Sequence, residues 1–266
     1  VLSPLRARAD APLSFGLTPV LLDSDIALLD LMQAYLQEAL NRPVDLVKRR
    51  TYQEITALLL SGELDAAWIC GFPYVQHWDR LSLIAVPLYH GQPLYQSYII
   101  VPKDRPVTDW RELRGDVHAF SDPDSNSGHL VTWALLADAQ ETPQRFFRQT
   151  FHTYGHRNVV RAVASGLAQS GSVDGYVWDV ISHRDPNLAN QTRVLRRSEW
   201  LGFPPVAHLK TDRDTSKIEQ LSVALQSAGN SQKGRDLLAM LELDGFAPEP
   251  ASLFDAIAAT YALVKS

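Results

Sequence analysis

The stretch that decides the fold is residues 121–133, with the sequence Ser-Asp-Pro-Asp-Ser-Asn-Ser-Gly-His-Leu-Val-Thr-Trp. The segment 117–120 before it is strand-like, and apolar residues at helical spacing follow it from Leu130 to Leu136. The polar triplet 125–127 therefore opens a helix, where backbone N–H groups lack partners and the helix dipole is positive. This pattern predicts either a receptor for a small oxygen-rich ligand or an ordinary helix cap.

The segments on either side of this stretch alternate between strand and helix patterns, which favours βαβ units and a largely parallel sheet. Residues Thr51 and Glu54 form a capping box, so a helix is expected to begin there and to end at Ser61-Gly62. The expected order in the first part of the chain is strand 13–17, helix 26–40, strand 44–48, the capped helix, and strand 66–70.

The same pattern returns about a hundred residues later, with strand 149–153, helix 157–164 and strand 173–178. Both helices end at Ser-Gly, and an apolar-Asp pair accompanies each following strand. Two matching units predict two α/β lobes, whose ligand crevice would lie outside the carboxyl ends of the strands. A chance match of such common elements is the alternative.

The chain is expected to cross between the lobes twice, at residues 97–101 and 200–205. Three C-terminal helices are predicted to return to the first lobe, at residues 217–228, 233–241 and 251–264. The predicted division is a discontinuous first lobe of residues 1–98 and 205–266, with residues 99–204 forming the second.

Composition narrows the function classes. The net charge is −5 and the longest basic run is 48–50, which argues against a nucleic-acid partner. No apolar stretch approaches the roughly 20 residues needed to span a bilayer. Cys70 is the only cysteine, so an intrachain disulfide is impossible. The polar segment 1–12 is interpreted as the start of a mature exported chain after signal-peptide removal, or as the remnant of a tag.

Several segments together resemble the periplasmic phosphonate-binding-protein family, the solute receptors of phosphonate and phosphite ABC importers and of related sensory proteins. The likeness covers roughly residues 13–210. Its motifs, fairly specific as an ordered set, are Tyr52-x-x-Ile55, the segment 64–68 with Gly71-x-Pro73-Tyr74, the segment 95–101 with Tyr95, the serine-rich loop 122–128, and His156 before a Val-rich helix.

The resemblance implies an α/β type II periplasmic-binding-protein fold, with two α/β lobes joined by hinge strands and the ligand cleft between them. It implies a monomeric periplasmic receptor without a cofactor and without enzymatic activity, whose partner is an ABC permease or a sensor histidine kinase. The ligand-binding residues that carry over from the family are Tyr52, Tyr95, Ser125, Asn126, Ser127 and His156.

Two departures from the family bear on the ligand. Aminophosphonate receptors hold the ligand ammonium with carboxylates; here Asp179 could supply one, but the segment 202–205 offers none. The second departure is Cys70, at the end of a predicted strand and facing the presumed cleft. A thiolate is a soft ligand, so arsenite bound through Cys70 is the favoured ligand, and signalling to a sensor histidine kinase the favoured role. A phosphonate or phosphite receptor of an ABC importer is the alternative, in which Cys70 only packs.

Three further residue patterns are weighed against simpler explanations. Trp178 is predicted to line the cleft, and packing against a hinge is its alternative. His152 and His156 have the spacing of a helical metal pair, but Gly155 between them argues against a metal site. Cys70 with His156 could act as a nucleophile pair, an enzyme hypothesis that we rank below a binding module.

Overall fold

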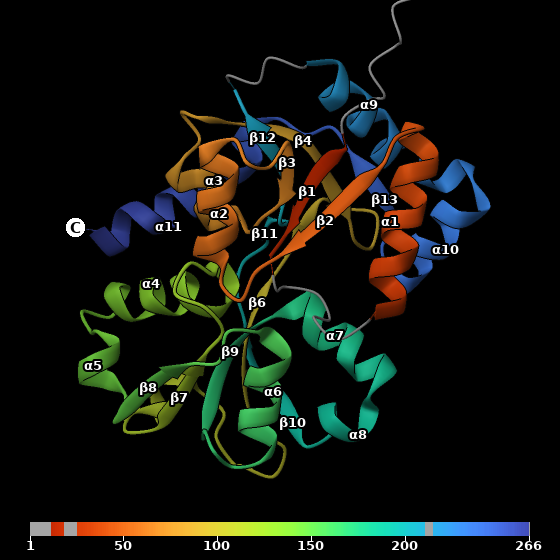
Figure 1. The fold of residues 1–266 in the computed structure, drawn as a ribbon. Helices are drawn as coiled ribbons and strands as arrows, with labels where there is room; N and C mark the ends of the chain where they lie inside the picture. Colours follow the sequence, from red (N-terminus) through yellow and green to blue (C-terminus); the bar gives the residue numbers. More distant parts are fainter. Residues whose placement is uncertain (1–11, 19–25, 211–214, 266) are drawn as a thin grey trace, which may run out of the picture.

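The computed structural model describes residues 12–18, 26–210 and 215–265, which form two main β-sheets flanked by helices (Figure 1). The interpretation of residues 1–12 as a mature N-terminus therefore falls, except for Pro12, outside the described residues. Both sheets mix parallel and antiparallel strands, so the expected parallel arrangement holds only for three strands of each.

The first sheet takes its strands from both ends of the chain. Its order is β13 (Gly245–Ala247), β4 (Leu81–Leu88), β12 (Val206–Leu209), β3 (Ala66–Trp68), β1 (Leu13–Leu17) and β2 (Val44–Lys48). One face carries α1 (Ile26–Leu40), α9 (Thr215–Gln226) and α10 (Gln232–Leu241), and the other carries α2 (Tyr52–Ser61) and α3 (Gly71–Gln76) (Figure 1).

The second sheet is built from the middle of the chain. Its order is β10 (Thr192–Arg197), β6 (Ser97–Pro102), β9 (Ser170–Asp174), β7 (Val117–Phe120) and β8 (Gln149–His152). Its helices are α4 (Val131–Asp138), α5 (Pro143–Phe146), α6 (His156–Ala164), α7 (Gly175–Arg184) and α8 (Pro186–Ala189).

The two sheets contain the same βαβαβ unit. In the first, β1 lies between β3 and β2, and all three are parallel. In the second, β7 lies between β9 and β8 with the same parallel pairing. Helices α1 and α2 connect the first set, and α4 and α6 connect the second. The predicted repetition is confirmed. In folds of this kind ligands bind outside the carboxyl ends of the parallel strands, so each unit contributes three strand ends at which ligand-binding residues can lie.

The chain passes between the sheets along two short strands that pair with each other, β5 (Leu94–Tyr95) and β11 (Leu201–Gly202). The expected crossing at 200–205 contains β11. The expected crossing at 97–101 is wrong, because these residues form β6 inside the second sheet. The lobe boundaries at 98 and 205 stay a prediction, although Ser97 and Tyr98 pair with β9 and so belong to the second sheet.

The predicted strand 173–178 is also wrong. Strand β9 ends at Asp174, and α7 begins at the next residue because the Asp174 carboxylate caps it, accepting from the Val177 N–H at 3.3 Å. Strand β9 begins at Ser170, three residues before the predicted start. Glycine is required at position 171 of this strand, because a Cβ there would lie 2.6 Å from Val159 Cγ1. The predicted strand 66–70 is shorter than expected, since β3 ends at Trp68.

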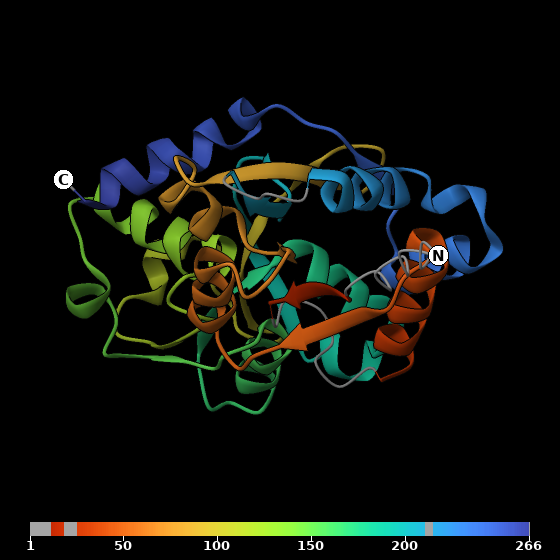
Figure 2. The ribbon, with the colours of Figure 1, turned by 45° about the horizontal axis from the view of Figure 1, so that its top comes forward.

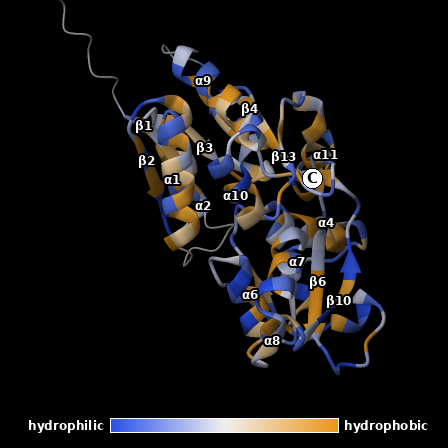
Figure 3. Ribbon diagram, turned by 90° about the vertical axis from the view of Figure 1, so that its right-hand side faces the viewer, coloured by the Kyte–Doolittle hydropathy of each residue, from blue (hydrophilic) through white to orange (hydrophobic). Residues whose placement is uncertain are grey.

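The C-terminal helices are where the sequence predicts them, with α11 (Asp255–Lys265) preceded by a short 3-10 turn, 251–254. Helix α11 packs against both α3 and α4, and so contacts helices of both sheets (Figure 2). Hydrophobic residues fill the inner strands, β6 and β4 among them (Figure 3). Across the described ranges, no helix is both long and apolar enough to cross a bilayer.

Candidate functional site

The carboxyl ends of the parallel strands and the strand β5 bring together one buried set of side chains, here called the site cluster. Each member is at most 3% exposed, although they come from both sheets. The members are Tyr52, Cys70, Tyr95, Ser125, Asn126, Ser127 and His156. All seven were predicted from the sequence, and the structure places them in hydrogen-bond contact or in adjacent positions.

The serine-rich loop begins a helix, as the sequence predicts. Ser125 is its cap and accepts from the Gly128 N–H at 3.0 Å. The first turn, Asn126–Leu130, is a π-helical turn that runs directly into α4. Only glycine fits at position 128, because a Cβ would lie 1.8 Å from Ser121 Oγ. The close approach of the loop to its own strand therefore depends on this residue.

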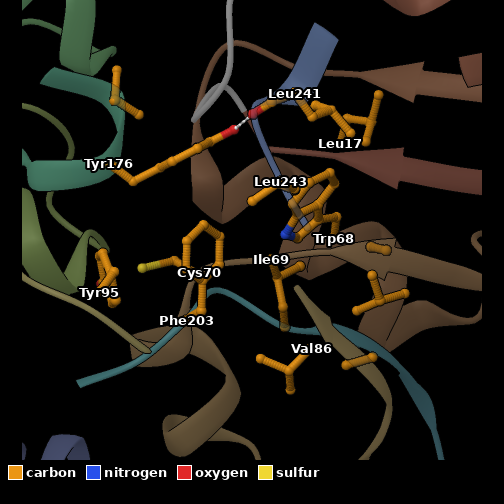
Figure 4. Close-up of a cluster of buried hydrophobic side chains, with 14 of the residues drawn as sticks. Leu17, Trp68, Ile69, Cys70, Val86, Tyr95, Tyr176, Phe203, Leu241 and Leu243 are labelled. Carbon is orange, nitrogen blue, oxygen red and sulfur yellow. Dashed lines mark hydrogen bonds between the residues drawn. The ribbon is translucent and has the colours of Figure 1, made fainter. Parts of the chain in front are cut away.

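Asn126 connects the loop to residues outside the second sheet. Its backbone N–H donates to Cys70 Sγ at 3.2 Å, and its side-chain Nδ2 donates to Tyr95 Oη at 2.9 Å. The Cys70 sulfur points toward Tyr95 (Figure 4). Burial raises the pKa of the Cys70 thiol to about 12, so the sulfur is a neutral S–H at pH 7.

His156 is the first residue of α6, and its ring forms a hydrogen bond with Tyr52, which belongs to α2 beside the first sheet. Burial lowers its pKa to about 3, so the ring is neutral at pH 7. Its Nδ1 accepts from the Asp174 N–H at 3.0 Å, so the ring proton is on Nε2. Nε2 lies 3.1 Å from Tyr52 Oη and donates to it. The Tyr52 hydroxyl, whose pKa burial raises, keeps its own hydrogen for another acceptor.

Two buried carboxylates adjoin the cluster, and sequence reasoning assigned neither of them to the site. Asp122 Oδ2 accepts from the Tyr52 N–H at 3.2 Å, and burial raises the pKa of Asp122. Asp174 Oδ2 lies 3.5 Å from Ser127 Oγ, and burial raises the pKa of Asp174 to about 7. Sequence reasoning missed Asp174, because an Asp beside a strand carries no sequence signal of burial against a loop 47 residues away.

The other predicted residues make their contacts elsewhere. Trp178 donates from its indole nitrogen to Thr192 Oγ1 at 3.1 Å and packs edge-on against Tyr98, which matches its alternative as a packing residue. Asp179 accepts from the hydroxyls of Tyr89 and Tyr98, each at 3.1 Å. We therefore build no ligand contact on Trp178 or Asp179.

His152 does not form a pair with His156. Its ring stacks against Phe120 and lies edge-on to His129. In the described parts of the chain, no group of three or more His, Cys, Asp or Glu residues could hold a metal ion.

The side chains of the site cluster have neutral or acidic hydrogen-bond partners. The hydrogen-bond partners of its side chains include no Lys or Arg among the described residues. Binding must therefore come from neutral donors: tyrosine and serine hydroxyls and the amides at the start of the loop helix. Such a site can hold a small oxygen-rich molecule by hydrogen bonds in a dry environment, where each bond is strong.

The sequence is similar to that of periplasmic substrate-binding proteins. A sequence profile described as "ABC transporter, phosphonate, periplasmic substrate-binding protein" matches residues 15–253. A phosphonates-binding periplasmic protein of Escherichia coli strain K12 is 25% identical over 198 residues, which are 72% of this chain and 57% of that protein. The chain thus spans little more than half the length of that relative.

Solved structures agree on the fold. A binding protein component of an ABC phosphonate transporter from Pseudomonas aeruginosa superposes with a TM-score of 0.87 at 18% identity, covering 96% of this chain and 87% of that one. A protein from Prochlorococcus marinus in complex with methylphosphonate gives a TM-score of 0.83 at 16% identity, covering 95% and 98%. The fold is therefore the type II periplasmic-binding-protein fold that the resemblance implies.

These matches are binding proteins rather than enzymes. The hydrogen bonds agree with this: both nitrogens of His156 contact Asp174 and Tyr52, and Cys70 contacts Asn126 instead. The nucleophile-pair hypothesis is accordingly set aside. Because the family profile covers residues 15–253, this chain belongs to the family of periplasmic phosphonate substrate-binding proteins of ABC transporters.

Proposed function

We propose that this protein is the periplasmic receptor of an ABC importer and captures a small phosphonate-type oxyacid at the site cluster. The observation that carries the proposal is the set of neutral donors around the Ser125–Ser127 loop, drawn from both sheets and buried together. The bound methylphosphonate of the structural relative supports the same ligand class. A periplasmic location and a permease partner follow from the family; the monomeric state and a removed signal peptide stay predictions.

Each donor has a role in this proposal. Tyr52 Oη accepts from His156 and Tyr95 Oη accepts from Asn126, so each phenol has its own hydrogen available for a ligand oxygen. Burial raises the pKa of both phenols, which keeps those hydrogens in place. The Ser125 hydroxyl accepts from Gly128 and retains its hydrogen in the same way.

Capture is coupled to closure in this proposal. The ligand donors belong to segments of both sheets, and their side chains are buried together, which corresponds to a closed form. A ligand that contacts both sides favours the closed form by its differential affinity for that form. The closed surface would then be what the permease recognises.

Titration calorimetry tests the proposal with methylphosphonate, phosphite and phosphate as probes. Tyr52→Phe is expected to weaken binding of the preferred probe by about 10- to 100-fold, because it removes a hydrogen bond to a charged ligand. Tyr74→Phe is the matched control, since Tyr74 is equally buried but packs against Phe254. Equal weakening by both variants, or no binding of any probe, contradicts the proposal.

Arsenite capture through Cys70 is the second candidate, favoured by the position of the sulfur. Cys70 follows β3 of the first sheet, and its Sγ accepts from the backbone N–H of Asn126 in the serine-rich loop. As a neutral thiol it could condense with an As–OH group, forming As–S and releasing water. A sensor histidine kinase would be the partner in this case. The family assignment supports the phosphonate reading more directly.

A single substitution separates the two candidates. Cys70→Ser is expected to leave methylphosphonate affinity within a few fold if the site holds phosphonates, because sulfur makes only a weak hydrogen bond. If arsenite is the ligand, the wild type binds it and the serine variant does not. Arsenite binding of equal strength in both proteins removes the thiol hypothesis.

A further inference from the structure

One acceptor in the site cluster has no partner. Asn126 is fully buried, and its amide is oriented by the bond from Nδ2 to Tyr95 Oη. The other end of the amide, Oδ1, is buried and makes no hydrogen bond. A buried acceptor without a partner is costly, and in native structures it usually marks a place for water or a ligand.

The surroundings of Asn126 cannot supply the missing hydrogen. Cys70 Sγ and Tyr95 Oη both lie beside Asn126, but they contact its backbone N–H and its Nδ2, respectively. Neither makes a hydrogen bond to Oδ1. The ligand itself is therefore the natural donor, and a fully ionised oxyanion has no hydrogen to give.

The charged groups that face the site cluster also favour a ligand that keeps a hydrogen. From β9, the Asp174 carboxylate approaches Ser127 Oγ, and from the loop after β7 the Asp122 carboxylate accepts from the Tyr52 N–H. His156 on α6 is neutral, as are the Cys70 thiol and the phenols of Tyr52 and Tyr95. Among the described residues no cation pairs with either carboxyl group, so each of them, when ionised, disfavours a second negative charge on the ligand. Burial raises the pKa of Asp174 to about 7, so this group carries its charge only toward the upper end of the pH range.

We propose that the site selects an oxyacid that retains a hydrogen on one oxygen, with Asn126 Oδ1 accepting that hydrogen. For a phosphonate, the bound species is then the monoanion and not the dianion. This inference rests on the proposed function and refines its substrate class. It also predicts discrimination against alkanesulfonates, which match a phosphonate monoanion in charge and tetrahedral shape but have no hydroxyl.

The first test compares two ligands on the wild-type protein. Methanesulfonate is expected to bind about 10- to 100-fold more weakly than methylphosphonate at pH 6, because it leaves Asn126 Oδ1 unpaired. Equal affinity for the two ligands overturns the inference while leaving an oxyanion receptor intact. No binding of either ligand contradicts both the inference and the proposed function.

The second test follows the pH dependence of calorimetric affinity for methylphosphonate and chloromethylphosphonate. If the monoanion is bound, affinity falls about tenfold per pH unit above the second pKa of the ligand. The electron-withdrawing chlorine lowers that pKa, so the decline must begin at a lower pH for chloromethylphosphonate. A decline at the same pH for both ligands assigns the titration to a protein group such as Asp174 and overturns the inference, as does an affinity that rises with pH.

A variant connects the effect to the amide. Asn126→Leu keeps the backbone N–H that contacts Cys70 but removes Oδ1. It is expected to bind methylphosphonate more weakly and to bring the phosphonate-to-sulfonate affinity ratio close to one. Asn158→Leu is the control, because the exposed Asn158 amide donates to the nearby Thr153 carbonyl and accepts from Arg161, away from the site cluster. A ratio unchanged from wild type in a folded Asn126→Leu protein argues against the assigned role.

Discussion

A single buried histidine outside the site shows how strongly one residue can connect stability to pH. His118 is fully buried in β7; its two ring nitrogens lie 2.8 Å from the hydroxyls of Ser170 and Ser172. The ring also stacks on Phe147, with 4.3 Å between centroids. Burial lowers the pKa of His118 to about 3, so the folded protein keeps the ring neutral over most of the acid range.

His118→Phe is expected to reduce the acid sensitivity of the protein. Below the unfolded-state pKa of about 6.5 the unfolded chain binds a proton at His118, while the folded chain does not until about pH 3. The wild type therefore loses stability as pH falls through this window. The stability difference between wild type and variant should shift by roughly 3 kcal/mol, in favour of the variant, between pH 7.5 and pH 4.5. Urea unfolding at the two pH values measures it; an unchanged difference contradicts the assignment.

At the scale of elements, local signals were predictable and tertiary ones were not. The capping box at Thr51 and the left-handed glycines at 62 and 166 fix helix ends within a few residues, so the sequence reveals them. The end of β9 is different, since Asp174-Gly175 can precede a strand or cap a helix. The choice depends on the Gly171 backbone packing under α6, a contact that no local pattern contains.

The capping box is expected to influence binding as well as stability, because α2 begins at Tyr52. Thr51→Ala removes the acceptor for the Glu54 N–H and should cost about 1 kcal/mol of unfolding free energy. It should also weaken ligand affinity several fold, since the first turn of α2 positions the Tyr52 hydroxyl.

Ser231→Ala is the control: it removes the equivalent cap of α10, in which Ser231 Oγ accepts from the Gly234 N–H at 3.0 Å. It should cost similar stability, measured by urea unfolding, without changing affinity in calorimetry. Equal affinity for the two variants contradicts the role of α2.

For the whole molecule, the sequence predicted which residues would meet but not how they pair. The strand-end positions of Cys70, Ser125 and His156 placed them on ligand-facing edges, because parallel strands present their carboxyl ends together. Their pairings depend on contacts across 104 residues for Tyr52 and His156, and 56 for Cys70 and Asn126. Which of these residues pair is determined by how the two sheets pack against each other. Neither the composition nor the periodicity of the sequence contains that information.

A hydrogen bond outside the site cluster also connects helices that flank the two different sheets. The Tyr176 hydroxyl on α7, beside the second sheet, donates to the Leu241 carbonyl at the end of α10, beside the first (Figure 4). Tyr35 makes a comparable bond on the first sheet alone, donating to the Ala224 carbonyl at 2.5 Å. Both bonds join a phenol to a helix carbonyl, so the two tyrosines form a matched pair for separating closure from general stability.

Tyr176→Phe is therefore expected to weaken methylphosphonate binding without touching the site cluster. If the bond forms only in the closed form, its loss of about 1 kcal/mol shifts the open–closed ratio, and the apparent Kd rises roughly fivefold when the free protein is mostly open. Tyr35→Phe should lose stability but keep its affinity. Small-angle scattering completes the argument, because ligand must reduce the radius of gyration of the wild type. An unchanged radius with bound ligand, or equal Kd changes in both variants, would mean that the sheets do not close over the ligand.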